Sequence, residues 1–76
     1  MSPKNLVYMA NQIGKFFANQ PEPMAVDSIA DHLKKFWDPR MRKAILEHLA
    51  AGGEGLDPRT LQAVGTLKAA AEKPAG

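Results

Sequence analysis

Three times along this chain a short polar residue stands directly before a proline: Ser2-Pro3, Asp38-Pro39 and Asp57-Pro58. A serine or aspartate side chain accepts hydrogen bonds from the free N–H groups in the first turn of a helix. Proline fits the next position because its missing N–H would have no partner there. The three pairs therefore predict three helix starts, and a fourth start is expected near Pro23.

Apolar residues recur at spacings of three and four after each start, which places them on one face of a helix. The expected helices run from Pro3 to Ala18, from Pro23 or Met24 to Phe36, from Pro39 to Ala51 and from Pro58 to Glu72. The residues expected to face inward are Leu6, Met9, Ala10, Ile13, Phe16 and Phe17; Val26, Ile29, Ala30, Leu33 and Phe36; Met41, Ile45, Leu46 and Leu49; and Leu61, Val64, Leu67 and Lys68 to Ala71.

The segments between the helices also follow from residue type. Pro21 and Pro23 cannot continue a helix, and Gly52-Gly53 suits the left-handed conformation that ends one. β-Branched residues occur only singly, so no strand is predicted. We predict an all-α fold, a small bundle of three to four short helices. Residues 1–72 are expected to form a single helical domain whose last helix is the most weakly buried, and residues 73–76 a flexible C-terminal tail.

The chain has 76 residues and no cysteine. A chain of this size buries only about 60% of the surface that its unfolded form exposes, so it often needs disulfides, a metal or a partner for stability. The absence of cysteine excludes disulfides, thiolate nucleophiles, Fe–S clusters and cysteine-type zinc sites in this chain. A partner protein is therefore the expected source of further stability.

No segment suggests a membrane span or an export signal. Hydrophobic residues make up 45% of the sequence, yet no apolar run approaches the roughly 20 residues that a membrane span requires. The N-terminus leads straight into an amphipathic pattern without a signal-peptide core. We expect a soluble, cytoplasmic chain with no membrane partner.

No arrangement of residues predicts catalysis. Neither Ser2 nor Ser28 lies in a nucleophile elbow, and His32 and His48 lie outside any metalloprotease motif. The glycine-rich segment at residues 52–55 lacks the preceding strand and the following Lys-Ser/Thr that a phosphate-binding loop requires. We predict no catalytic, cofactor-binding or metal-binding residue, and no enzyme activity for the chain by itself.

The basic residues are concentrated in one stretch. Residues 34–43 hold five bases and one acid, and the only tryptophan lies among them at a sharp helix corner. Tryptophan and arginine are enriched at binding hot spots, so this tryptophan is either a core residue alone or a core residue that also forms part of a partner surface.

Asn11 and Gln12 are two amides beside the apolar stripe of the first helix. They are either inert surface groups or partners for another chain's backbone. The predicted partner-contact residues are Asn11, Gln12, Phe36, Trp37, Arg40, Met41 and Arg42.

Four blocks of the sequence carry a family resemblance. They are residues 9–14 with Phe16-Phe17, residues 29–32, residues 36–42 and residues 52–58. Over about residues 6–58 they closely resemble the delta subunit of NAD-dependent formate dehydrogenase. The string Phe-Trp-Asp-Pro-Arg-Met-Arg at residues 36–42 is the most specific block, and residues 59–76 resemble the family only in being helical and alanine-rich.

The resemblance implies a small accessory subunit of a soluble molybdenum enzyme that oxidises formate to carbon dioxide and reduces NAD+. In that family the large subunits hold bis-molybdopterin guanine dinucleotide, Fe–S clusters and FMN, and the catalytic and other large subunits are the expected partners. The leading hypothesis is a noncatalytic subunit that docks on the complex and stabilises it. A maturation factor that assists molybdenum-cofactor insertion remains an alternative. A small helical nucleic-acid-binding protein is a more distant one, because the second helix is acidic and the net charge is only +2.

Overall fold

The computed structural model describes residues 3–72, and within that range it contains four α-helices and no strand. The helices are α1 (Pro3–Phe16), α2 (Glu22–Phe36), α3 (Pro39–Ala50) and α4 (Pro58–Glu72). The predicted all-α fold is therefore confirmed. The predicted cap Ser2 and the predicted tail at residues 73–76 lie outside the described residues.

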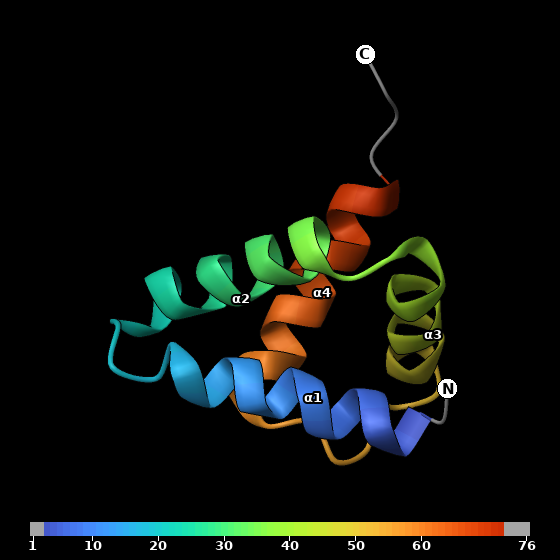
Figure 1. Cartoon of the computed structure of the whole chain (residues 1–76), viewed down its shortest axis with the longest axis horizontal. Coiled ribbons are helices and arrows are strands. Elements are labelled where there is room, and N and C mark those ends of the chain that lie inside the picture. The colour runs from blue at the N-terminus through green and yellow to red at the C-terminus, as the bar shows by residue number, and fades with distance from the viewer. Residues whose placement is uncertain (1–2, 73–76) are drawn as a thin grey trace.

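The four helices pack around one core. α1 and α2 run side by side in opposite directions, α4 crosses behind them, and α3 stands at one end of the pair (Figure 1). The most extensive helix–helix contact is that between α2 and α4, although the two are far apart in the sequence. The expectation of a weakly buried last helix is therefore wrong for the first three turns of α4, where Thr60, Ala63, Val64 and Leu67 are buried.

The described helices begin at or close to the prolines singled out in the sequence. Asp38 is the N-cap of α3, and its carboxylate accepts a hydrogen bond of 2.9 Å from the backbone N–H of Met41. α4 begins at Pro58, as predicted, and the carbonyl of Asp57 accepts its first helical hydrogen bond from Leu61. α2 begins at Glu22, one residue earlier than expected.

Helix ends differ by one or two residues from the prediction. α1 ends at Phe16 instead of Ala18, because the N–H of Ala18 donates to the carbonyl of Lys15, three residues back, in a tight turn. α3 ends at Ala50, and the N–H groups of Gly52 and Gly53 donate to carbonyls of its last turn. Gly53 has a φ of 67° and is buried beneath Leu61, which explains why the chain has glycine there.

The core draws residues from all four helices and from the α2–α3 corner. Its buried members are apolar and mostly small or medium in size: Leu6, Ala10, Val26, Ile29, Ala30, Leu33, Trp37, Ile45, Ala63, Val64 and Leu67. Among the described residues, eight further apolar side chains are partly buried against this core, including Ile13, Phe17, Met41, Leu46 and Leu49. Most of the predicted inward faces are therefore confirmed.

Met9 and Phe16 are corrections to the predicted face of α1. Met9 is 41% exposed and Phe16 is 77% exposed, because the buried residues of α1 are Leu6, Ala10 and Gly14 at intervals of four. Successive helix residues are rotated by about 100°, so Met9 and Phe16 lie well away from that buried line. The small residues at positions 10 and 14 decide which side of α1 faces the bundle.

Phe36, Leu61 and Ala71 are the corrections on α2 and α4. Phe36 is 72% exposed because the next residue, Trp37, takes the place at the end of the buried face of α2. Leu61 is 36% exposed, since it lies at the edge of the bundle over Gly53. Ala71 is exposed beyond the last buried residue of α4, Leu67.

Gly14 allows α1 to pack directly on Thr60 of α4. Both residues are buried, and a Cβ atom at position 14 would overlap the hydroxyl oxygen of Thr60. Within residues 3–71 that hydroxyl is the one buried side-chain polar atom without a hydrogen-bond partner. The contact is therefore one of close packing, and it requires glycine at this position.

We predict that Gly14→Ala destabilises the fold by about 1–3 kcal/mol, because the added methyl group overpacks the contact with Thr60. In a Thr60→Ala background the obstacle is removed, and the same substitution should stabilise by about 0.5–1 kcal/mol through the better helix propensity of alanine. Urea denaturation of the four proteins of this cycle measures both values. Equal destabilisation in the two backgrounds would show that the hydroxyl is not the obstacle.

Candidate functional site

The corner between α2 and α3 is built around Trp37. The indole is only 5% exposed and belongs to the core, while the backbone at Trp37 turns to an extended conformation that ends α2. The N–H of Trp37 still donates to the carbonyl of Leu33 at 3.1 Å. Trp37 therefore fills the core, and little of its surface remains for another molecule to contact.

Arg42, which lies on α3, stabilises this corner through hydrogen bonds. Its guanidinium donates to the carbonyls of Lys34 and Trp37, at 2.8 and 2.6 Å. A cation that binds the last carbonyls of a helix also interacts favourably with the helix dipole, so Arg42 caps the C-terminal end of α2. Its hydrogen-bonding capacity is thus partly used within the chain, although the sequence placed it on a partner surface.

The remaining members of the basic stretch divide into exposed and paired groups. Arg40 lies exposed in the first turn of α3, and Met41 beside it is half-buried against the core. Lys35 forms an ion pair of 3.0 Å with Asp31, one turn earlier on α2. In the part of the chain that the structure describes, no salt bridge joins Lys34, Arg40 or Lys43 to a carboxylate. The positive charge that a partner would meet is therefore smaller than the sequence suggests.

Asn11 joins α1 to the loop before α4 through two hydrogen bonds, which we call the Asn11 bracket. Its amide nitrogen donates to the carbonyl of Gly55 at 2.9 Å, and its amide oxygen accepts from the N–H of Asp57, also at 2.9 Å. His48 holds the same loop from α3 through a contact of 2.7 Å between Nε2 and the carbonyl of Glu54. Gln12, by contrast, is exposed on α1. Of the two amides singled out in the sequence, Asn11 has a clear role within the chain.

A group of four rings lies on the outside of α1 and α2. Phe16 and Phe17 meet edge to face with centroids 5.0 Å apart, Phe17 and His32 are 6.3 Å apart, and His32 and Phe36 are 4.6 Å apart. We call Phe16, Phe17, His32 and Phe36 the aromatic row. Sequence reasoning placed Phe36 on a partner surface but missed the other three, although two adjacent phenylalanines at a helix end cannot both face the core.

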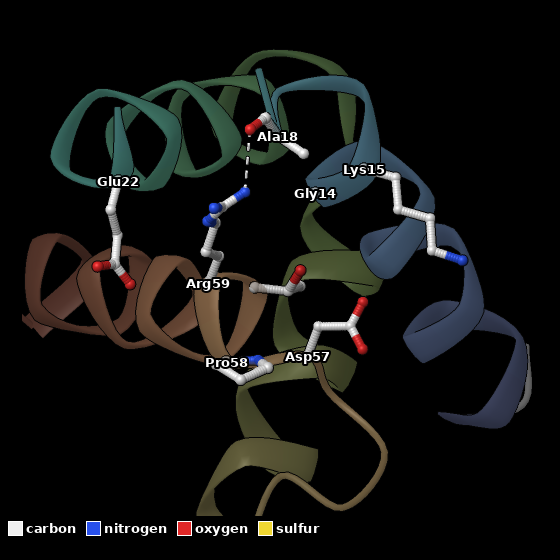
Figure 2. A pocket seen from close by; sticks show the side chains of 8 residues that line it. Gly14, Lys15, Ala18, Glu22, Asp57, Pro58 and Arg59 are labelled. Atoms are coloured by element: carbon white, nitrogen blue, oxygen red, sulfur yellow. Dashed lines mark hydrogen bonds between the residues drawn. The ribbon is translucent and has the colours of Figure 1, made fainter. Parts of the chain in front are cut away.

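A pocket of about 390 Å³ lies where the end of α1 meets the start of α4. Its lining carries two cations and two carboxylates, Lys15 and Arg59 with Glu22 and Asp57. Arg59 reaches across to donate to the carbonyl of Ala18 at 3.2 Å, with Glu22 and Asp57 on either side of it and the Lys15 ammonium pointing away (Figure 2). Arg59 thus lies between two carboxylates and joins α4 to the segment that follows α1.

The described residues contain neither a metal-ligand cluster nor a membrane-spanning helix. No cluster of three or more histidine, aspartate or glutamate side chains there could hold a metal ion. Among the described helices, none has the length and hydropathy that crossing a bilayer requires. Two candidate surfaces for protein contacts remain: the aromatic row, and the exposed cations Lys34, Arg40 and Lys43, which we call the basic corner.

Comparison with known proteins gives one match. A family model described as the NADH-dependent formate dehydrogenase delta subunit FdsD matches residues 5–64, which include nearly all of α1, the whole of α2 and α3, and the first half of α4. No curated protein and no solved structure matches the chain. The match covers most of the 76 residues, including the aromatic row and the Trp37 corner.

We predict that Asn11→Ala loosens the loop at residues 52–57, because both hydrogen bonds of the bracket are lost. The two bonds are exposed, so the expected cost is about 1 kcal/mol in total. Hydrogen exchange at the Asp57 amide should accelerate in Asn11→Ala. Asn11→Asp, which keeps the acceptor, should preserve more of the protection, and Gln12→Ala is the matched control on the neighbouring exposed amide. An unchanged exchange rate at Asp57 would contradict the bracket.

We predict that Trp37→Ala unfolds much of the protein. Removing a buried indole costs about 3–5 kcal/mol, a large part of the total stability of about 5–15 kcal/mol that small domains have. Thermal melts followed by circular dichroism should show a much lower Tm for this variant. Trp37→Phe should lose less, and the exposed Arg40→Ala should stay within about 0.5 kcal/mol of the unsubstituted chain. A melt of Trp37→Ala like that of Arg40→Ala would refute the core role of Trp37.

Proposed function

The chain belongs to the delta-subunit family of NADH-dependent formate dehydrogenase, and from this membership we propose that it is a noncatalytic accessory subunit that docks on the larger subunits and stabilises the assembled enzyme. The observation that carries the proposal is the family match over residues 5–64. A delta subunit has other formate dehydrogenase subunits as its partners. The reaction of the whole complex would be formate oxidation to carbon dioxide with reduction of NAD+.

The residue chemistry of the chain supports a noncatalytic role. The complex is expected to hold bis-molybdopterin guanine dinucleotide, Fe–S clusters and FMN, whose chemistry is electron transfer from formate to NAD+. This chain has no cysteine to ligate an Fe–S cluster, and its described residues contain no cluster of metal ligands. Its residues do not fit these groups, so we assign the groups to the larger subunits and assign this chain no chemical step.

A docking subunit can stabilise an enzyme without contributing to its chemistry. A chain that binds only the assembled state shifts the equilibrium toward that state by mass action. The larger subunits would also stabilise this chain, which has only a small core of its own. Burial of its exposed side chains against a larger subunit would add apolar contact that the isolated chain lacks. The assembled enzyme and this subunit would each stabilise the other.

A maturation role remains the second candidate, and the exposed cations of the basic corner favour it. Lys34, Arg40 and Lys43 form no salt bridge with a carboxylate in the described part of the chain, so they are available to a phosphate-rich pterin dinucleotide. The two roles make different predictions for enzyme assembled without this chain.

We predict that deleting this chain lowers the yield of assembled enzyme or its survival on heating, while activity per molybdenum stays nearly unchanged. The reason is that the chain contributes binding area and no reacting group. The measurements are molybdenum per catalytic subunit, activity per molybdenum and the rate of thermal inactivation, with and without the chain. Re-expression of the unsubstituted chain is the control and should restore the yield or the survival.

The pattern of losses distinguishes the two roles. A maturation factor would leave low molybdenum content from the start, with normal lifetime in the loaded fraction. Full loading, normal lifetime and a reduced rate per molybdenum would contradict both roles, because this result would place the chain at the active site or on the electron path.

A further inference from the structure

We infer that the aromatic row of Phe16, Phe17, His32 and Phe36 is the docking surface of this chain, and that its occupant is an apolar cleft with an acidic rim on one of the larger formate dehydrogenase subunits. The inference rests on the proposed function and goes beyond it, because it names the surface and the chemistry of its partner. It also replaces Trp37 with exposed rings as the centre of the contact.

The row consists of two half-buried rings in its middle and two exposed rings at its ends. Phe17 and His32 are half-buried and hold the middle of the row, with their ring centroids 6.3 Å apart. Phe16 and Phe36 extend from them at 5.0 and 4.6 Å, and are 77% and 72% exposed. The exposed rings therefore already have neighbours that restrict their motion, so binding would cost them less conformational entropy.

Exposed phenylalanines of this kind are unusual on a chain without a partner. Phenylalanine is among the residues most often buried, and yet two of the three in this sequence are more than two-thirds exposed. A contiguous exposed apolar patch marks an interaction surface more often than a scattered residue does. Aromatic rings are also enriched in the buried centre of protein interfaces, where their large area contributes most to affinity.

A groove lies along the row. It has a volume of about 290 Å³ and is lined by Phe17, Ser28, Asp31, His32, Lys35 and Phe36. Its two charged residues, Asp31 and Lys35, form an ion pair of 3.0 Å. The groove therefore presents three rings of the row beside a paired acid and base, and it offers no unpaired charge to an ion.

The charges near the two ends of the row identify the rim of the partner. Lys15 precedes Phe16 on α1, and Arg40 follows Phe36 by four residues across the corner; both are exposed. No salt bridge joins either of them to a carboxylate within the described residues. A second copy of this chain would bring such cations toward one another, whereas carboxylates around an apolar cleft would complement them. Charge complementarity therefore favours an acidic rim on a larger subunit over self-association.

The alternative centre of the contact, the Trp37 corner, is largely used within the fold. The indole is buried, and Arg42 donates to two carbonyls of the same chain. Phe36 is the member of the sequence-predicted surface that belongs to the row, and Arg40, four residues later, is also exposed. The row therefore shares Phe36 with that prediction and adds Phe16, Phe17 and His32.

The test measures the Kd of the full chain for formate dehydrogenase that has been purified from cells lacking this chain. Phe16→Ala and Phe36→Ala should each weaken binding by about tenfold or more, and the double variant by about a hundredfold. Both side chains are exposed, and alanine has the higher helix propensity, so the fold should be retained; circular dichroism checks this. Tyr8→Ala is the matched control, because Tyr8 is a 65% exposed aromatic residue on α1 outside the row, and its Kd should not change.

A second arm tests the rim. Arg40→Glu should weaken binding several-fold at low salt, and the difference from the unsubstituted chain should shrink as the salt concentration rises. Lys4→Glu, an exposed charge reversal near the start of α1, is the matched control and should bind like the unsubstituted chain. Equal effects of the two reversals would overturn the acidic rim.

The outcomes separate this inference from the proposed function. If the unsubstituted chain binds and the Phe16→Ala/Phe36→Ala variant binds with the same Kd, the row is overturned and the docking role stands. If the unsubstituted chain does not bind the enzyme, the docking role itself fails. If sedimentation shows a dimer that the double variant loses while its Kd for the enzyme is unchanged, the occupant is a second copy of the chain and the inference is overturned.

Discussion

Burial of the Trp37 indole at the corner between α2 and α3 is the interaction on which the rest of the arrangement depends. The indole lies at the end of the buried face of α2 and joins the core shared by all four helices. Neighbouring residues point in different directions, so placing Trp37 inside leaves Phe36 outside, where it is 72% exposed. One side chain in the core thus determines the direction of α3 and also exposes the ring that ends the aromatic row.

Polar groups of this chain serve mainly to fix the joints between helices. Arg42 caps α2 at the corner, Arg59 reaches from α4 to the end of α1, and Asn11 holds the loop before α4. In each case a side chain donates to a backbone carbonyl just after a helix or in a loop, in another segment of the chain. Each of these hydrogen bonds restricts a connection between helices that few apolar contacts hold in place. They therefore help a chain with a small core to adopt one arrangement of its helices.

These internal uses change where a partner can bind. The basic stretch at residues 34–43 looks in the sequence like one concentrated patch. In the fold, Arg42 donates to backbone carbonyls and Lys35 is paired with Asp31, while Phe16 and Phe36 of the row are exposed. A contact formed mainly by rings with a few charges at its edge agrees with the general anatomy of protein interfaces, in which an apolar centre is surrounded by a polar rim.

The sequence by itself determined the local structure: helix starts at Asp38-Pro39 and Asp57-Pro58, a helix stop at Gly52-Gly53, and most of the inward faces. These features depend on backbone hydrogen bonds and on residues within one turn, which a sequence shows directly. The family resemblance was equally visible in the sequence over about residues 6–58, and the family model matches residues 5–64.

Which edge of each apolar helix face is buried depends on how the helices pack against one another. A stripe of apolar residues is wider than the line of closest contact, so periodicity could not show that α1 packs along Leu6, Ala10 and Gly14 and leaves Phe16 exposed. Nor could it show that Asn11 and Arg42 are used within the chain, since each bonds to groups brought near it by folding. The aromatic row has the same origin: its rings come from the last residue of α1, the residue after it and α2, and only folding brings them together as one surface.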